Sequence, residues 1–360
     1  MIRMKTTVNA LSASLAVALM VTACSTPTAA PTNLAAVDSL QCKAAEAPQT
    51  VALAASFYED ASAWRTYMTS AAAINAKDFK DGKSVAESLK VGATVEPKQL
   101  LRGAIAYAAI IGLQDQAFLD GARGFANGPA QRQVLVSELK SNPYRVTNMP
   151  GAERAAAAIV AALGEEGDKV LKAGTAVKQS AYDVQKQPWS KEFVSDREGR
   201  LAAVRVLSTT AIKGSIEDVT RLQEASLTPT TAPATVQNAS FNGTVTWSPV
   251  VVRGLALAAL AALGEAGEEN AEQVASLMTD EPSMFCLKMS KLMLYQCLAA
   301  AKPHYEDMFC IGQHELMDIG ECTLKSVGIP KAIKAAPKVE IAETETTSSA
   351  TASKASGSPK

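Results

Sequence analysis

Four cysteines crowd into one short segment toward the C-terminal end of the chain: Cys286, Cys297, Cys310 and Cys322. The segment predicts two helices, at 281–301 and 305–319, that meet at a turn around Pro303. Both the inner and the outer cysteine pair are symmetric about this turn. Because residues equidistant from the turn of an antiparallel hairpin lie opposite each other, the spacing predicts nested disulfides, Cys297–Cys310 inside Cys286–Cys322.

The angular positions of the cysteines on the first predicted helix support this pairing. On the second predicted helix the pairing requires the helix to end between its two cysteines. Cys286 to Cys297 is an advance of about 20° beyond three full turns, so these two cysteines share a helix face. Cys310 to Cys322 is an advance of about 120°, so we expect Gly320 to end the helix before the last cysteine. Such bonds form in an oxidising compartment, and closing the inner loop should contribute roughly 3 kcal/mol.

The same segment offers a metal site as an alternative. Cys310, His314 and Asp318 follow one another at intervals of four residues, and methionines are frequent around them, a ligand set that suits copper. However, methionines at helical spacing usually fill a core, and the cysteine spacing lacks the short CxxC pairs typical of zinc. We therefore predict no metal site and no cofactor.

Nucleophilic catalysis is not indicated. His304 and His314 are the only histidines, and both lie among cysteines that we expect to be oxidised. We therefore predict no catalytic residues and a protein that is not an enzyme. Cys42 is left over, with a thiol either free or bonded to another chain.

The first residues have the three parts of an export signal. Arg3 and Lys5 precede an apolar stretch that is far shorter than the roughly 20 residues of a membrane-spanning helix. Val21-Thr22-Ala23-Cys24 resembles the lipobox of bacterial lipoproteins, which implies cleavage before Cys24 and acylation of its thiol, anchoring the chain in a membrane. The alternative is an ordinary cleaved signal. By family analogy, Ser25 favours sorting to the outer membrane, facing the periplasm.

Behind this signal peptide (1–23) we predict a lipidated tether (24–45), a helical body (46–278), a four-cysteine hairpin (279–330) and a disordered tail (331–360). The low aromatic content, 5%, and the abundance of alanine favour close helix packing, so the fold class is all-α. The predicted body helices span about 48–75, 97–120, 129–141, 151–187, 197–225 and 250–278. The Thr- and Pro-rich interval 227–249 predicts either a small β-hairpin or a long loop.

An internal repeat runs through the body. Residues 161–167 (AALGEEG) recur at 261–267 (AALGEAG), each behind an Ala-rich helix that opens near an arginine. Arginines at similar spacing are Arg102, Arg154, Arg200 and Arg253. An Ala-rich helix, a Gly-containing turn and a second helix resemble HEAT-type α-hairpin repeats, although chance similarity of two Ala-rich helices is the alternative. The triplet Tyr-Glu-Asp also occurs twice, at 58–60 and 305–307.

Charge and resemblance together favour a binding role in the cell envelope. Loss of residues 1–23 lowers the net charge from −1 to −3, which argues against a nucleic-acid partner. Residues 289–322 are similar to envelope proteins of unknown function in alphaproteobacteria. We expect a non-enzymatic, lipid-anchored scaffold that binds an envelope protein. The alternative is a periplasmic protein that binds a metal or small ligand through the C-terminal hairpin.

Overall fold

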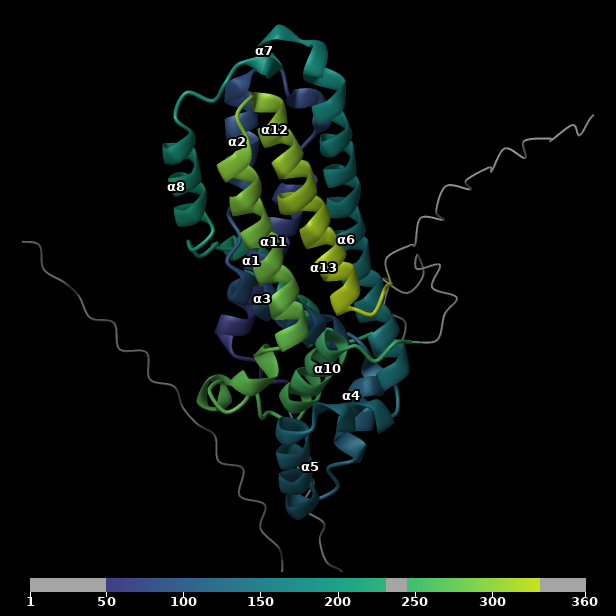
Figure 1. Ribbon diagram of the computed structural model, residues 1–360. Coiled ribbons are helices and arrows are strands. Elements are labelled where there is room, and N and C mark those ends of the chain that lie inside the picture. The colour runs from purple at the N-terminus through teal and green to yellow at the C-terminus, as the bar shows by residue number, and fades with distance from the viewer. Residues whose placement is uncertain (1–49, 231–244, 331–360) are drawn as a thin grey trace, which may run out of the picture. The chain divides into compact units, whose positions relative to one another are not determined.

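The structure is a computed structural model that describes residues 50–230 and 245–330. Its α-helices are α1 (Ala55–Ala72), α2 (Gly82–Gly92), α3 (Pro97–Leu113), α4 (Gln116–Gly124), α5 (Pro129–Ser141), α6 (Ala152–Asp183), α7 (Pro188–Lys191), α8 (Arg197–Leu207), α9 (Ile216–Leu227), α10 (Pro249–Ala262), α11 (Glu281–Ala300), α12 (His304–Cys310) and α13 (Asp318–Ser326). A π-helical segment, η7 (Ile311–Met317), joins α12 to α13 (Figure 1). The described residues contain only isolated β-bridges and no strand, so the all-α prediction is confirmed for them.

Several predicted features lie outside the described residues. These are the signal peptide, Cys24 and its tether, Cys42, most of the predicted hairpin or loop at 227–249, and the tail after residue 330. Within the described residues, two predicted helices are each divided. Asp115 separates α3 from α4, because its carboxylate accepts from the Phe118 N–H and caps a new helix. Residues 208–215 separate α8 from α9.

The core is built around two helices that are apolar on nearly every side. In α3 every residue from Gly103 to Leu113 is buried, and in α10 almost every residue is. A helix that is apolar all round belongs inside a protein, and small residues let these two cross closely. A Cβ on Gly254 would lie 2.5 Å from the Cβ of Ala108. Alanines such as Ala108 and Ala258 therefore lie in the contact surface between α3 and α10.

The end of α10 differs from the prediction of a helix to residue 278. Ser248 caps its first turn and Pro249 occupies the first helical position, as expected for a helix start. Gly264 has a φ of +75°, a left-handed conformation that ends helices and favours glycine. Residues 265–278 then form turns and short 3₁₀ segments instead of continuing the helix.

The two copies of the repeat, residues 161–167 and 261–267, have different structures. The second copy turns at Gly264, but the first lies inside α6, which runs unbroken for 32 residues. The turn that the HEAT-type resemblance implies is therefore wrong for the first copy, whereas the helix predicted over 151–187 is confirmed. The first copy stays helical because its glycines are packing positions: a Cβ on Gly164 would lie 2.6 Å from Ile329, and one on Gly167 would lie 3.1 Å from Thr323.

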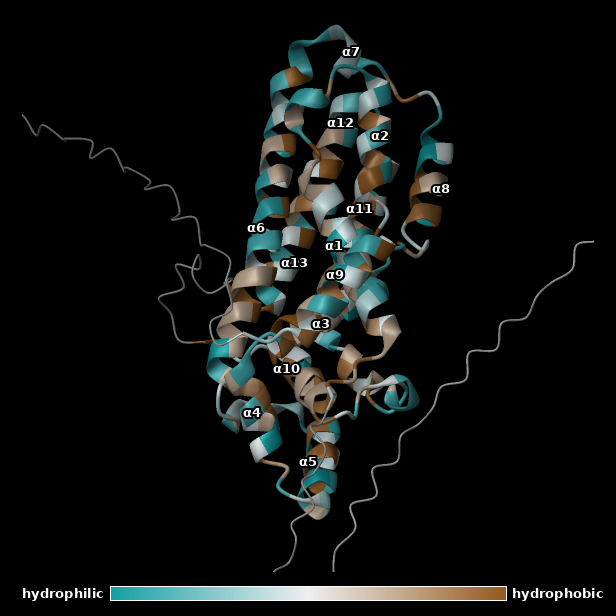
Figure 2. Cartoon of the chain, turned by 180° about the vertical axis from the view of Figure 1, so that it is seen from behind, coloured by the Kyte–Doolittle hydropathy of each residue, from teal (hydrophilic) through white to brown (hydrophobic). Residues whose placement is uncertain are grey.

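The contact between α6 and the C-terminal helices is a seam of glycines. Along α6 these are Gly167 and Gly174, and facing them are Gly320 and Gly312 in the reverse order, so the two segments run antiparallel. A Cβ on Gly320 would lie 2.7 Å from the Leu171 backbone nitrogen. Figure 1 shows the resulting arrangement, with α6 alongside α12 and α13. Hydrophilic residues alternate with apolar ones along α6, so one side faces this packing and the other faces solvent (Figure 2).

The four arginines that marked the repeat hold neighbouring elements together. Arg102 pairs with Asp60, Arg154 with Asp115 and Arg200 with Asp307, whereas Arg253 donates to the Ser276 carbonyl. Two of the aspartates end the repeated Tyr-Glu-Asp triplets. The triplets therefore share a structural role, since each supplies the carboxylate that binds an arginine from another helix.

Candidate functional site

The nested disulfides in the C-terminal helices are confirmed. Cys286 bonds to Cys322 and Cys297 bonds to Cys310, each pair with a Cα–Cα distance of 5.7 Å. Both bonds tie α11 to the chain that runs back along it. They fix the turn at residues 301–303 and the start of α12 relative to the end of α11, and this is where the candidate site lies.

The π-helical segment η7 explains how the second helix brings both of its cysteines to one face. The prediction that Gly320 ends the helix is wrong, because α13 continues through Gly320 and Cys322 to Ser326. A π-helix has roughly 4.4 residues per turn, so each residue advances about 18° less than in an α-helix. The seven residues of η7 therefore remove about 125°, which cancels the mismatch of about 120° between Cys310 and Cys322.

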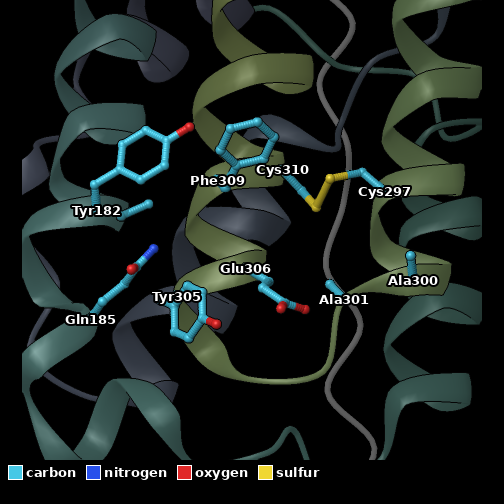
Figure 3. A pocket seen from close by; sticks show the side chains of 10 residues that line it. Tyr182, Gln185, Cys297, Ala300, Ala301, Tyr305, Glu306, Phe309 and Cys310 are labelled. Atoms are coloured by element: carbon cyan, nitrogen blue, oxygen red, sulfur yellow. A yellow bond between two sulfur atoms is a disulfide. The ribbon is translucent and has the colours of Figure 1, made fainter.

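A pocket of about 460 Å³ opens between the end of α6, the end of α11 and the start of α12 (Figure 3). Its lining is mainly apolar and consists of Ala181, Tyr182, Gln185, Cys297, Ala300, Ala301, Tyr305, Glu306, Phe309 and Cys310. The inner disulfide forms part of the wall. A concave apolar surface with a few polar groups at its edge is typical of small-molecule sites.

Aromatic side chains dominate one side of the pocket. Tyr305 and Phe309 lie one turn apart on α12, and Tyr182 meets Phe309 from α6, edge to face, with ring centroids 6.1 Å apart. The Lys178 ammonium lies 5.1 Å from the centroid of the Phe309 ring and also donates to Gln313. The Phe309 ring thus already carries a cation on one face, as expected from the negative charge on the faces of aromatic rings.

Hydrogen bonds to backbone groups hold the rim of the pocket at the turn between α11 and α12. The Lys302 N–H donates to Glu306 Oε2 at 2.7 Å, and the Arg197 Nε donates to the Ala301 carbonyl at 2.8 Å. The Val194 N–H donates to the Lys302 carbonyl at 2.9 Å. The rim is therefore preformed, because elements distant in sequence fix its backbone.

Behind the pocket, α12 carries a buried ion pair. Asp307 and Arg200 are both almost fully buried, and Arg200 also donates to the Leu298 carbonyl. Burial raises the pKa of Asp307, and the charge of Arg200 opposes that rise. The Arg200 Nε has no hydrogen-bond partner. Removing one member of such a pair leaves an uncompensated buried charge, so this pair fixes α8 against α12.

A second buried acid lies on the π-helical segment. The Glu315 side chain is buried, neither carboxyl oxygen has a hydrogen-bond partner, and burial raises its pKa well above the usual value. A Cβ on Gly92 would lie 2.2 Å from its Oε2, so α2 covers the carboxyl group. The Tyr67 hydroxyl donates to the Glu315 backbone carbonyl at 3.3 Å, not to its side chain. Sequence pattern alone did not single out Glu315.

The residues considered as metal ligands do not come together. His314 pairs with Asp318, with 2.8 Å between Nδ1 and Oδ2, but Cys310 is bonded to Cys297. In residues 50–230 and 245–330, no group of three or more His, Cys, Asp or Glu side chains could hold a metal ion. The pocket residues Tyr182 and Gln185 were missed, because no sequence signal links the end of α6 to α12.

Comparisons with known protein families, with curated proteins and with solved structures found no match for this chain. None of the helices in the described residues is long and apolar enough to cross a membrane.

Proposed function

We propose that the chain is a lipid-anchored protein of the bacterial cell envelope and that its helical body is a non-enzymatic binding module. The pocket beside the Cys297–Cys310 disulfide is the observation that carries this proposal. It lies between the end of α6 and the C-terminal hairpin, the segment through which the alternative prediction expected a metal or small ligand to bind, and its lining is mainly apolar. Of the two predicted kinds of target, a small ligand therefore has the better structural support.

The anchor has a test of its own. Replacing Cys24 by Ser removes the only thiol in the lipobox that could be acylated, so we expect the protein to move from the membrane fraction to the soluble periplasmic fraction. Acyl chains contribute about 0.8 kcal/mol per buried CH₂, enough for durable anchoring when several chains are attached. Fractionation of cells expressing the wild-type and Cys24→Ser chains measures this. Equal membrane retention of both proteins would overturn the lipid anchor.

The binding role is tested by filling the pocket. Ala300 lines the pocket and Ala299 beside it does not, and both are exposed at the end of α11. We expect Ala300→Trp to abolish retention of the natural ligand, because the indole occupies the cavity, and Ala299→Trp to leave it unchanged. Native mass spectrometry of each protein purified from cells reads out the bound mass. An identical ligand mass in both variants would contradict pocket binding.

A second candidate function is protein binding through the outer face of α11, which is the scaffold role predicted first. Phe285 and Leu292 are seven residues apart on one helix face, and they are 65% and 45% exposed. Large exposed apolar side chains of this kind often mark contact sites. This role is favoured over the pocket if Phe285→Ser abolishes cross-linking to an envelope protein in cells while Ala300→Trp leaves it intact.

A further inference from the structure

The charge of the pocket indicates the class of ligand that it takes. Among the ten residues that line it, Glu306 is the only carboxylate, and no Lys, Arg or His is one of them. Two cations contact the lining from outside, and both already have partners: Lys178 donates to Gln313, and Arg197 donates to backbone carbonyls at the end of α11. Oε2 of Glu306 accepts from the Lys302 N–H, and no described residue hydrogen-bonds to its Oε1. A negative charge at the edge of an apolar pocket attracts a cation and repels a carboxylate or phosphate.

The aromatic rings of the pocket point the same way. Tyr182, Tyr305 and Phe309 all line it, and ring faces carry the negative part of the aromatic quadrupole. The Lys178 ammonium already lies 5.1 Å from the centroid of the Phe309 ring, so the ring of Tyr305 is the one left for a cation of the ligand. Tyr305 lies next to Glu306 in the sequence, and Figure 3 shows both at the same end of the pocket. The rings and the carboxylate together resemble the surroundings in which proteins hold alkylated ammonium groups.

The remaining polar groups are available to a ligand. No described residue hydrogen-bonds to the hydroxyl groups of Tyr182 and Tyr305 or to the side-chain amide of Gln185, all of which line the pocket. The lining also includes alanines and the Cys297–Cys310 disulfide, which offer apolar contact without charge. Such a site favours a molecule with an apolar body, one positive charge and a small number of hydrogen-bonding groups.

We propose that this pocket binds an amphipathic organic cation, with its ammonium group between Glu306 and the ring of Tyr305 and its apolar body along Phe309, Tyr182 and the inner disulfide. The proposal rests on the proposed function, because it names the ligand class for the same pocket. It excludes fatty acids and other organic anions as ligands, since they would place a negative charge beside Glu306.

The test compares three probes that share a phenyl group: benzyltrimethylammonium, its neutral carbon isostere neopentylbenzene, and the anion phenylmethanesulfonate. Ligand-detected NMR on the purified full chain measures their dissociation constants. We expect the cation to bind at least about fivefold more tightly than the neutral isostere and the anion not to bind. Glu306→Gln, whose amide oxygen still accepts from Lys302, should weaken the cation about fivefold and leave the neutral probe unchanged.

Variants separate this inference from the proposed function. Tyr305→Leu should weaken binding of the cation more than Tyr305→Phe does, because phenylalanine keeps the ring. Glu281→Gln, on the exposed start of α11, is the control for loss of a negative charge and should leave binding of the cation unchanged. If the neutral probe binds as well as the cation and Ala300→Trp blocks both, the pocket binds ligands but the cation proposal is overturned. If no probe binds and Ala300→Trp also leaves the mass carried from cells unchanged, both proposals fail.

Discussion

Removal of both disulfides is expected to lower the free energy of unfolding by about 6 kcal/mol. The inner bond closes a loop of 13 residues and the outer bond one of 36. Loop-closure entropy assigns about 3 kcal/mol to the inner bond and about 4 to the outer, with a smaller sum because the inner bond already shortens the outer loop. Folded proteins are stable by only about 5–15 kcal/mol, so the chain without both bonds should be close to unfolding.

Urea denaturation of paired alanine variants measures these contributions. Cys286→Ala with Cys322→Ala should cost more than Cys297→Ala with Cys310→Ala, because the outer loop is longer. Cys42→Ala, which removes a thiol outside both bonds, should change stability by less than about 0.5 kcal/mol. A larger loss from the inner pair would show that the inner bond acts through packing around the buried Cys310 and not through loop length.

The disulfide pairing could be predicted because it depends on how many residues separate each cysteine from the turn, and these numbers can be counted in the sequence. The all-α fold could be predicted for a similar reason, since alanine-rich helices such as α3 and α10 carry their packing preference in their own composition. The ends of elements were less predictable. Gly164 and Gly264 stand in nearly the same local sequence, yet one is inside α6 and the other ends α10. What separates them is a tertiary contact, the approach of Ile329 to Gly164.

The candidate site was only partly predictable. The cysteine hairpin was identified from its spacing, but the pocket also needs Tyr182 and Gln185, which stand more than 100 residues earlier in the chain. The π-helical segment was also missed, because one sequence can satisfy either helix type locally. The sequence did contain one sign of the π-helical segment: Cys310 and Cys322 would lie about 120° apart on an ideal α-helix and so could not share a face. A predicted break at Gly320 resolved that misfit incorrectly, since Gly320 serves instead for the close contact with Leu171.

The Glu315 side chain is expected to make the protein less stable as the pH rises, and Glu315→Gln should remove that dependence. Burial raises the folded-state pKa well above the usual value of 4.5, with a smaller contribution from the charge of Asp307. The folded state therefore holds the proton more tightly than the unfolded state. Stability is full below about pH 4.5 and falls as the pH rises from there toward the folded-state pKa. We therefore expect the wild type to lose stability steadily between pH 5 and pH 8, because the unfolded state releases this proton more readily than the folded state.

The difference between the wild type and Glu315→Gln isolates Glu315 together with its coupling to Asp307, because Asp60, whose pKa burial also raises, titrates equally in both proteins. Urea denaturation across pH 5–8 should show the two stabilities converging at low pH and separating above it, with the variant more stable. Glu224→Gln, on an exposed position of α9, should follow the wild type. Parallel curves for the wild type and Glu315→Gln would mean that the folded protein holds Glu315 without a raised pKa. In that case the register of the two disulfides would by itself explain the π-helical segment. Burial of the Glu315 carboxyl group would not destabilise the folded protein.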